Sequence, residues 1–127
     1  MPSPARDTAA KPEAGAVVTK AVLRAAERLK LNARELAGVI GVSEAGVSRL
    51  RKGTLTLEAG SKPYELAVLF IRLFRSLDAI TGGDEATARA WLRNENSVLR
   101  RKPVQAIESI SGLVAVIGYL DARRALV

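Results

Sequence analysis

The chain has 127 residues, which is the size of one ordinary domain or of two very small ones that share a core. It contains no cysteine and no histidine, which excludes disulfides, thiolate chemistry, the commonest metal ligands and the usual acid–base residue at neutral pH. Twenty Lys and Arg against thirteen Asp and Glu give a net charge of +7. This excess favours polyanionic partners, above all nucleic acid, although a solvated basic surface has the same composition.

The N-terminal segment, residues 1–15, is rich in Pro, Ala and charge and has no helical period. This composition predicts a disordered arm, to which we assign no function. It also lacks the apolar run of a signal peptide. The longest apolar stretch, residues 66–80, is too short for a bilayer and is interrupted by Arg72 and Arg75. We therefore expect a cytoplasmic protein with no membrane segment.

Helical periodicity begins at Ala16, and strand-like alternation is absent, so the predicted fold class is all-α. N-cap residues and glycine stops mark the expected boundaries, and Asn32 and Glu35 have the spacing of a capping box. Gly112 is expected to separate the last two helices, with Ile110 on the apolar face of the first of them. The expected helices cover residues 16–29, 33–40, 44–52, 62–80, 85–92, 103–110 and 113–125.

Residues 33–52 have the pattern of a helix-turn-helix. The small Ala37 lets two helices cross closely, and Gly41 suits the left-handed turn between them. The surrounding core positions are all aliphatic, namely Leu36, Ile40, Val42, Val47 and Leu50. An ordinary helical hairpin with a glycine turn would share part of this pattern.

The predicted outer face of the helix at residues 44–52 favours the DNA-binding interpretation. Ala45 and Gly46 would let this helix lie close in a major groove, and Arg49 can reach a guanine edge with both terminal nitrogens. The other side chains suit phosphates or, for the serines, phosphate or base. The predicted DNA-binding residues are Ser43, Ser48, Arg49, Arg51 and Lys52.

The expected helix at residues 62–80 is apolar almost all the way round. Such a helix is buried on most sides, so it lies between the two halves of the chain, at a dimer contact, or both. A homodimer is expected, because most readers of this type bind two half-sites one DNA turn apart. These patterns predict a helix-turn-helix domain at residues 16–81 and a second helical domain at residues 82–127.

The C-terminal part, residues 82–127, has no nucleophile–base pair, phosphate loop or metal-ligand spacing. Asp84 and Glu85 are explained as helix-capping residues. We therefore expect no enzyme activity, no cofactor and no metal.

Residues 80–124 resemble the toxin-binding domain of the Xre/MbcA/ParS antitoxins. The resemblance rests on an ordered set of positions, and together with the helix-turn-helix and the long helix it covers about residues 17–126. One departure is Arg100-Arg101, where that family usually has a glycine just after Leu99. The matching positions are Gly82-Gly83-Asp84, Ala90-Trp91-Leu92, Asn94 to Asn96, Leu99, Pro103, Ile107, Gly112, Val116 and Leu120.

The resemblance implies an antitoxin of a type II toxin–antitoxin system, which neutralises a RES-domain toxin that degrades NAD and represses its own operon by binding operator DNA. The alternative is a plain helix-turn-helix repressor whose C-terminal half dimerises or senses a ligand. Residues such as Trp91 and Tyr119 are more often part of the core than of a contact surface, and residues 100–102 have the alternative of a solvated turn. The toxin-facing candidates are Trp91, Arg93, Arg100, Arg101, Lys102, Tyr119, Arg123 and Arg124.

Overall fold

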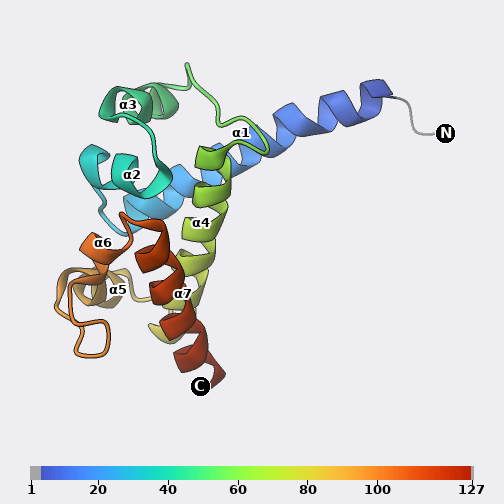
Figure 1. Ribbon diagram of the computed structural model, residues 1–127. Coiled ribbons are helices and arrows are strands. Elements are labelled where there is room, and N and C mark those ends of the chain that lie inside the picture. The colour runs from blue at the N-terminus through green and yellow to red at the C-terminus, as the bar shows by residue number, and fades with distance from the viewer. Residues whose placement is uncertain (1–3, 127) are drawn as a thin grey trace.

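The computed structural model describes the backbone of residues 4–126 and the side chains of residues 13–126. Over this range the fold is all-helical, as predicted, and the other helices pack around the helix at residues 62–80 (Figure 1). Within the described residues, no helix has both the length and the apolarity needed to cross a membrane. The helices are α1 (Pro4–Arg28), α2 (Ala33–Ile40), α3 (Glu44–Lys52), α4 (Lys62–Ile80), α5 (Glu85–Arg93), α6 (Pro103–Ala106) and α7 (Ile110–Ala125).

The boundaries of α2 and α3 follow from local hydrogen bonds that the sequence predicts. Asn32 and Glu35 form the capping box: the Asn32 Oδ1 accepts from the Glu35 N–H at 2.7 Å, and the Glu35 Oε1 accepts from the Asn32 N–H at 2.9 Å. Gly41 ends α2 with φ of 72°, in the left-handed region that favours glycine. Ser43 caps α3, which ends at Gly53.

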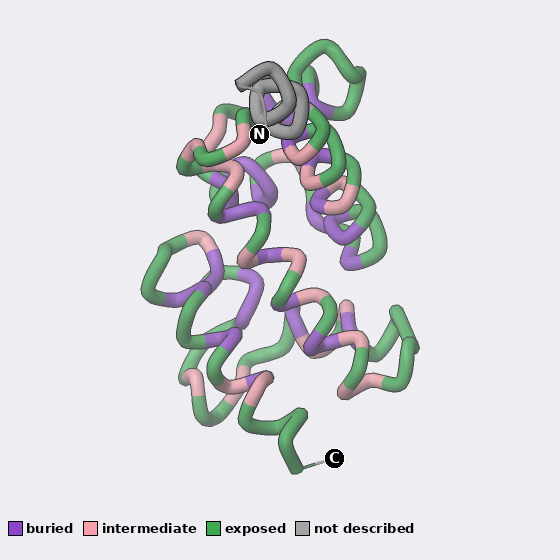
Figure 2. The backbone as a smooth tube through the Cα atoms, turned by 90° about the vertical axis from the view of Figure 1, so that its right-hand side faces the viewer, coloured by how far each residue is buried: buried purple, intermediate pink, exposed green. Residues whose placement is uncertain are grey.

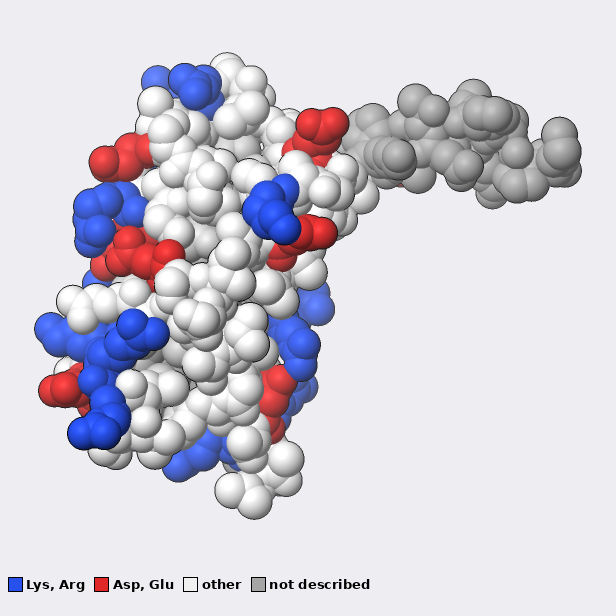
Figure 3. Space-filling model, in the orientation of Figure 1, with Lys and Arg blue, Asp and Glu red and all other residues white. Residues whose placement is uncertain are grey.

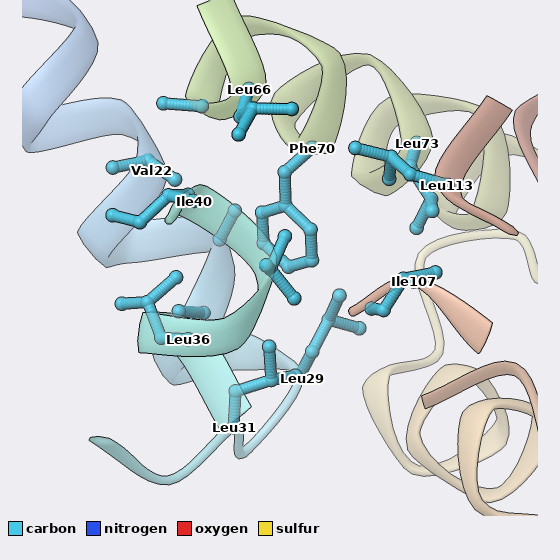
Figure 4. Close-up of a cluster of buried hydrophobic side chains, with 14 of the residues drawn as sticks. Val22, Leu29, Leu31, Leu36, Ile40, Leu66, Phe70, Leu73, Ile107 and Leu113 are labelled. Atoms are coloured by element: carbon cyan, nitrogen blue, oxygen red, sulfur yellow. The ribbon is translucent and has the colours of Figure 1, made fainter. Parts of the chain in front are cut away.

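Helix α4 packs against α1, α2 and α7, so the N-terminal and C-terminal parts of the chain share one hydrophobic core. Phe70 is fully buried at its centre, between Leu36 and Ile40 of α2 on one side and Leu113 of α7 on the other (Figure 4). In Figure 2 the buried stretches lie on the inner sides of the helices. The position of α4 therefore confirms the prediction that it lies between the two halves.

Three expected boundaries are wrong: the start of α1, the end of α6 and the start of α7. The structure continues α1 back to Pro4, so residues 4–15 of the predicted arm are helical, and residues 1–3 lie outside the described residues. Four alanines between residues 5 and 14 favour the helix, and Pro4 is tolerated in its first turn. Pro12 lies inside the helix, where proline removes one backbone hydrogen bond.

The other two wrong boundaries are neighbours: α6 ends at Ala106 rather than at residue 110, and α7 begins at Ile110 rather than after Gly112. Ser109 caps this helix, because its Oγ accepts from the Gly112 N–H at 3.1 Å. Ile110 is 60% exposed, so it does not belong to the apolar face of α6. Gly112 lies within the first turn of α7, where its missing side chain allows a close approach to Ala106 of α6.

Candidate functional site

The outer face of α3 presents the side chains predicted to contact DNA. Ser48, Arg49, Arg51 and Lys52 are all exposed, and within the described residues no acidic side chain forms an ion pair with them. Among these four side chains, Arg51 alone forms a hydrogen bond to another part of the described chain, a long one of 3.5 Å from its Nη2 to the Leu31 carbonyl. This face is therefore free to meet a polyanion.

Ser43 and Gly46 were both expected to face DNA, but each also has a role within the turn before α3. The Ser43 Oγ accepts from the Gly46 N–H at 2.9 Å as the cap of α3, which leaves its own hydroxyl proton free to be donated. Gly46 is buried rather than exposed. A Cβ there would lie 3.2 Å from the Ser43 Oγ and 3.4 Å from the Val42 Cβ, so Gly46 serves the packing of the turn.

A second group of the predicted residues meets between α5 and α7. The rings of Trp91 and Tyr119 stack, with centroids 6.0 Å apart and planes 19° from parallel. The Arg123 guanidinium lies 6.0 Å from the centroid of the Tyr119 ring, at cation–π distance. Both rings are half-buried, so each packs on the core and keeps a part that another molecule can touch.

The connection between α5 and α6 is a tight turn built on Asn96. Its Oδ1 accepts from the Val98 and Leu99 N–H groups at 2.9 and 3.0 Å, and its carbonyl accepts from the Arg100 N–H at 2.7 Å. Arg100 has φ of 62°, a conformation that favours glycine, at the place where the resembling family usually has one. Arg100, Arg101 and Lys102 are exposed, and Figure 3 shows basic side chains gathered over α5, α6 and their connection.

The outer side of α7 carries an exposed stripe of apolar and small residues spaced four apart. Such spacing places them along one face of a helix. A Cβ at Gly118, in the middle of the stripe, would meet nothing within 4 Å, so another backbone could approach closely there. The stripe consists of Ile110, Val114, Gly118, Ala122 and the C-cap residue Leu126.

Arg93 lies on the side of α5 that faces α2, away from the stack of Trp91 and Tyr119. Its Nη1 and Nη2 donate to the two carboxylate oxygens of Glu35 at 2.7 and 2.9 Å. The hydrogen bonds from Arg93 hold the pKa of Glu35 below its ordinary value of 4.5 and, in turn, raise the pKa of Arg93, although burial opposes both shifts. Glu35 was expected only as a capping residue, so this contact across the chain was missed.

Arg124 also lies apart, at a groove of about 820 Å³ between α1, α4 and α7. Apolar side chains make up much of the groove lining, among them Val17, 67% exposed, and Val68, 42% exposed, and Arg75 also lines it. Arg72 at its edge is paired with Asp121, which also accepts from the Ser76 Oγ at 3.0 Å. The eight predicted toxin-facing residues therefore lie in four places: the aromatic stack, the α5–α6 turn, the contact of Arg93 with Glu35, and the groove that Arg124 lines.

Two family models match the chain. The model described as the antitoxin Xre-like helix-turn-helix domain matches residues 8–72, and the model described as the antitoxin Xre/MbcA/ParS C-terminal toxin-binding domain matches residues 76–125. Among curated proteins, none matches this chain. The two matched regions meet within α4, the helix around which both halves pack. The chain therefore belongs to the Xre-like antitoxins of type II toxin–antitoxin systems, with a DNA-binding helix-turn-helix in its N-terminal half and a toxin-binding domain in its C-terminal half.

Proposed function

We propose that this antitoxin neutralises a RES-domain, NAD-degrading toxin and represses its own operon by binding operator DNA through α3. The free basic face of α3 is the observation that supports operator binding. The RES class of the toxin follows from the resemblance described above. In this proposal the chain acts in the cytoplasm, where the operator lies, and acts by binding alone rather than as an enzyme.

The toxin-facing surface in this proposal joins the α5–α6 turn to the outer face of α7. Trp91, Tyr119 and Arg123 lie at its centre, because half-buried aromatics with an arginine are the side chains that most often carry binding energy. Arg100, Arg101 and Lys102 supply its positive edge, and the stripe on α7 supplies its apolar part. Arg93 and Arg124 are left out, since one is engaged by Glu35 and the other lines the groove.

A second copy of this chain is the proposed occupant of the α1–α4–α7 groove. Val17 and Val68 bring exposed apolar side chains from two helices to one groove, and a two-fold contact would place this patch of each copy against the same patch of the other. The groove also lies away from the aromatic stack, which leaves the toxin-facing surface open in a dimer.

Co-expression with the toxin encoded beside this chain tests the proposal. The wild-type chain should restore growth and cellular NAD, and it should co-purify with the toxin. Gly118→Arg places a bulky charge in open space on the α7 stripe, so it should fold normally and weaken toxin binding at least about tenfold. Thr54→Arg, at an exposed position after α3, is the matched control.

If the neighbouring toxin neither binds the wild-type chain nor loses its toxicity, the proposal fails. The plain repressor, whose C-terminal half dimerises or senses a ligand, would then be the better account.

A further inference from the structure

Helix α5 presents different residues to two sides of the molecule. Arg89 and Arg93 are four residues apart and lie on one side, which contacts the corner between α1 and α2. Trp91 is about 200° away from Arg89 around the helix, and it stacks on Tyr119 of α7. One nine-residue helix therefore lies between the proposed toxin-facing surface and the helix-turn-helix.

The side of α5 that faces the helix-turn-helix is held by charged hydrogen bonds. Besides its two bonds to Glu35, the Arg93 Nη2 donates to the Lys30 carbonyl at 2.9 Å. The Arg89 Nη1 donates to the Arg28 carbonyl at 3.3 Å. These carbonyls belong to the end of α1 and the residues just after it, where backbone acceptors lack helical partners.

Glu35 transmits this contact into α2, because it has two functions at once. Its Oε1 accepts from the Asn32 N–H within the capping box, and the same carboxylate receives both Arg93 nitrogens. The residue is only 6% exposed, so the carboxylate depends on these partners. A movement of Arg93 therefore disturbs the first turn of α2, the helix that packs on α3.

We propose that Arg93 is a positioning residue through which the toxin changes the affinity of this chain for its operator. A toxin that presses on the Trp91 side displaces α5, and the Arg93–Glu35 pair passes the displacement to α2 and so to α3. The inference rests on the proposed function, since it needs both partners. Arg34 and Glu108, 3.6 Å apart, form a weaker second link between α2 and the residues after α6.

The test is the ratio of operator dissociation constants with and without saturating toxin, at one salt concentration. The probes are the DNA upstream of the coding sequence and the toxin from the neighbouring gene. The variant is the double substitution Glu35→Gln, Arg93→Met, in which glutamine still accepts from Asn32 and no charge stays buried. The control Lys62→Met, Glu65→Gln removes an exposed pair within α4.

The wild type and the control should show a ratio that departs from one by at least about fivefold. The double variant should show a ratio within about twofold of one, while it still binds DNA alone and toxin alone. Arg93→Lys keeps the charge but loses the bidentate contact, so its ratio should lie between that of the wild type and that of the double variant. A ratio near one in the wild type, or an unchanged ratio in the double variant, overturns the inference; failure of the wild type to bind either partner overturns the proposed function instead.

A measurement on the chain alone removes the dependence on the toxin. The sequence has no cysteine, so Glu44→Cys on α3 and Ala115→Cys on α7 give two exposed and specific spin-label positions. The distance distribution between the labels should be narrow with Arg93 and Glu35 intact and should broaden in the double variant. Identical distributions would show that the pair does not position α3.

Discussion

Gly112 lies directly against the carbonyl group of Ala106, so that a Cβ at residue 112 would overlap the carbonyl oxygen. A backbone atom cannot swing aside as a long side chain can. We therefore expect Gly112→Ala to lower the free energy of unfolding by about 1–3 kcal/mol, because α6 and α7 must move apart. Thermal or urea unfolding followed by circular dichroism measures this loss.

Gly118→Ala is the control for that prediction, because Gly118 lies in the same helix and a Cβ there meets nothing within 4 Å. It should raise the free energy of unfolding by about 0.5–1 kcal/mol, through the better helix propensity of alanine. Equal effects at the two positions would contradict the close approach at Gly112.

Arg100 combines an exposed guanidinium with a backbone conformation that favours glycine. Arg100→Gly should therefore raise the free energy of unfolding by about 1 kcal/mol while it weakens toxin binding. Unfolding curves and co-purification with the toxin measure the two effects. Lys30→Gly, at φ of 59°, is the control and should raise the free energy of unfolding without weakening toxin binding. An Arg100→Gly variant that is stabilised but keeps full toxin affinity would remove Arg100 from the proposed surface.

The pair between Glu35 and Arg93 makes stability depend on pH. Because hydrogen bonds from Arg93 lower the pKa of Glu35 below 4.5, its contribution is fully present above 4.5 and is lost as the pH falls through the lowered pKa. The difference in free energy of unfolding between wild type and the Glu35→Gln, Arg93→Met variant should therefore shrink between pH 7 and about pH 3. Urea titrations at both pH values measure it, and comparison with the variant cancels other acidic groups such as Asp84, whose pKa is lowered by hydrogen bonds from Thr87.

Arg49 and Lys52 are predicted to contribute differently to operator binding. Arg49→Ala should cost about 1–3 kcal/mol and relax the preference for the operator over other DNA. Lys52→Ala should weaken binding to all sequences alike and reduce the slope of log affinity against log salt by about one. Fluorescence anisotropy over a salt series with operator and scrambled DNA separates the two, and unchanged operator affinity in Arg49→Ala would refute the role given to Arg49.

Val68 tests the proposed contact between two copies. Val68→Glu places a charge in the apolar lining of the α1–α4–α7 groove, and it should shift the chain from dimer to monomer at micromolar concentration. Val98→Glu, at an exposed valine in the α5–α6 connection, should leave the dimer intact. Sedimentation equilibrium distinguishes the two, and a Val68→Glu variant that remains dimeric would place the contact elsewhere.

Local signals in the sequence predict the helix-turn-helix well, because its boundaries depend on neighbouring residues. The Asn32–Glu35 capping box and the left-handed Gly41 need only contacts within one turn of helix. Contacts between distant residues could not be predicted in this way. The Arg93–Glu35 pair spans 58 residues, and the close approach of Gly112 to Ala106 depends on how two helices pack.

Because α4 packs against both halves of the chain, it also determines how the protein unfolds. Phe70 and its neighbours serve both halves, so neither half keeps a core of its own when the other opens. Cooperative unfolding then exposes the whole chain in one event, and a protease that captures the opened state destroys both binding activities together. The chain therefore loses DNA binding and toxin binding at the same rate.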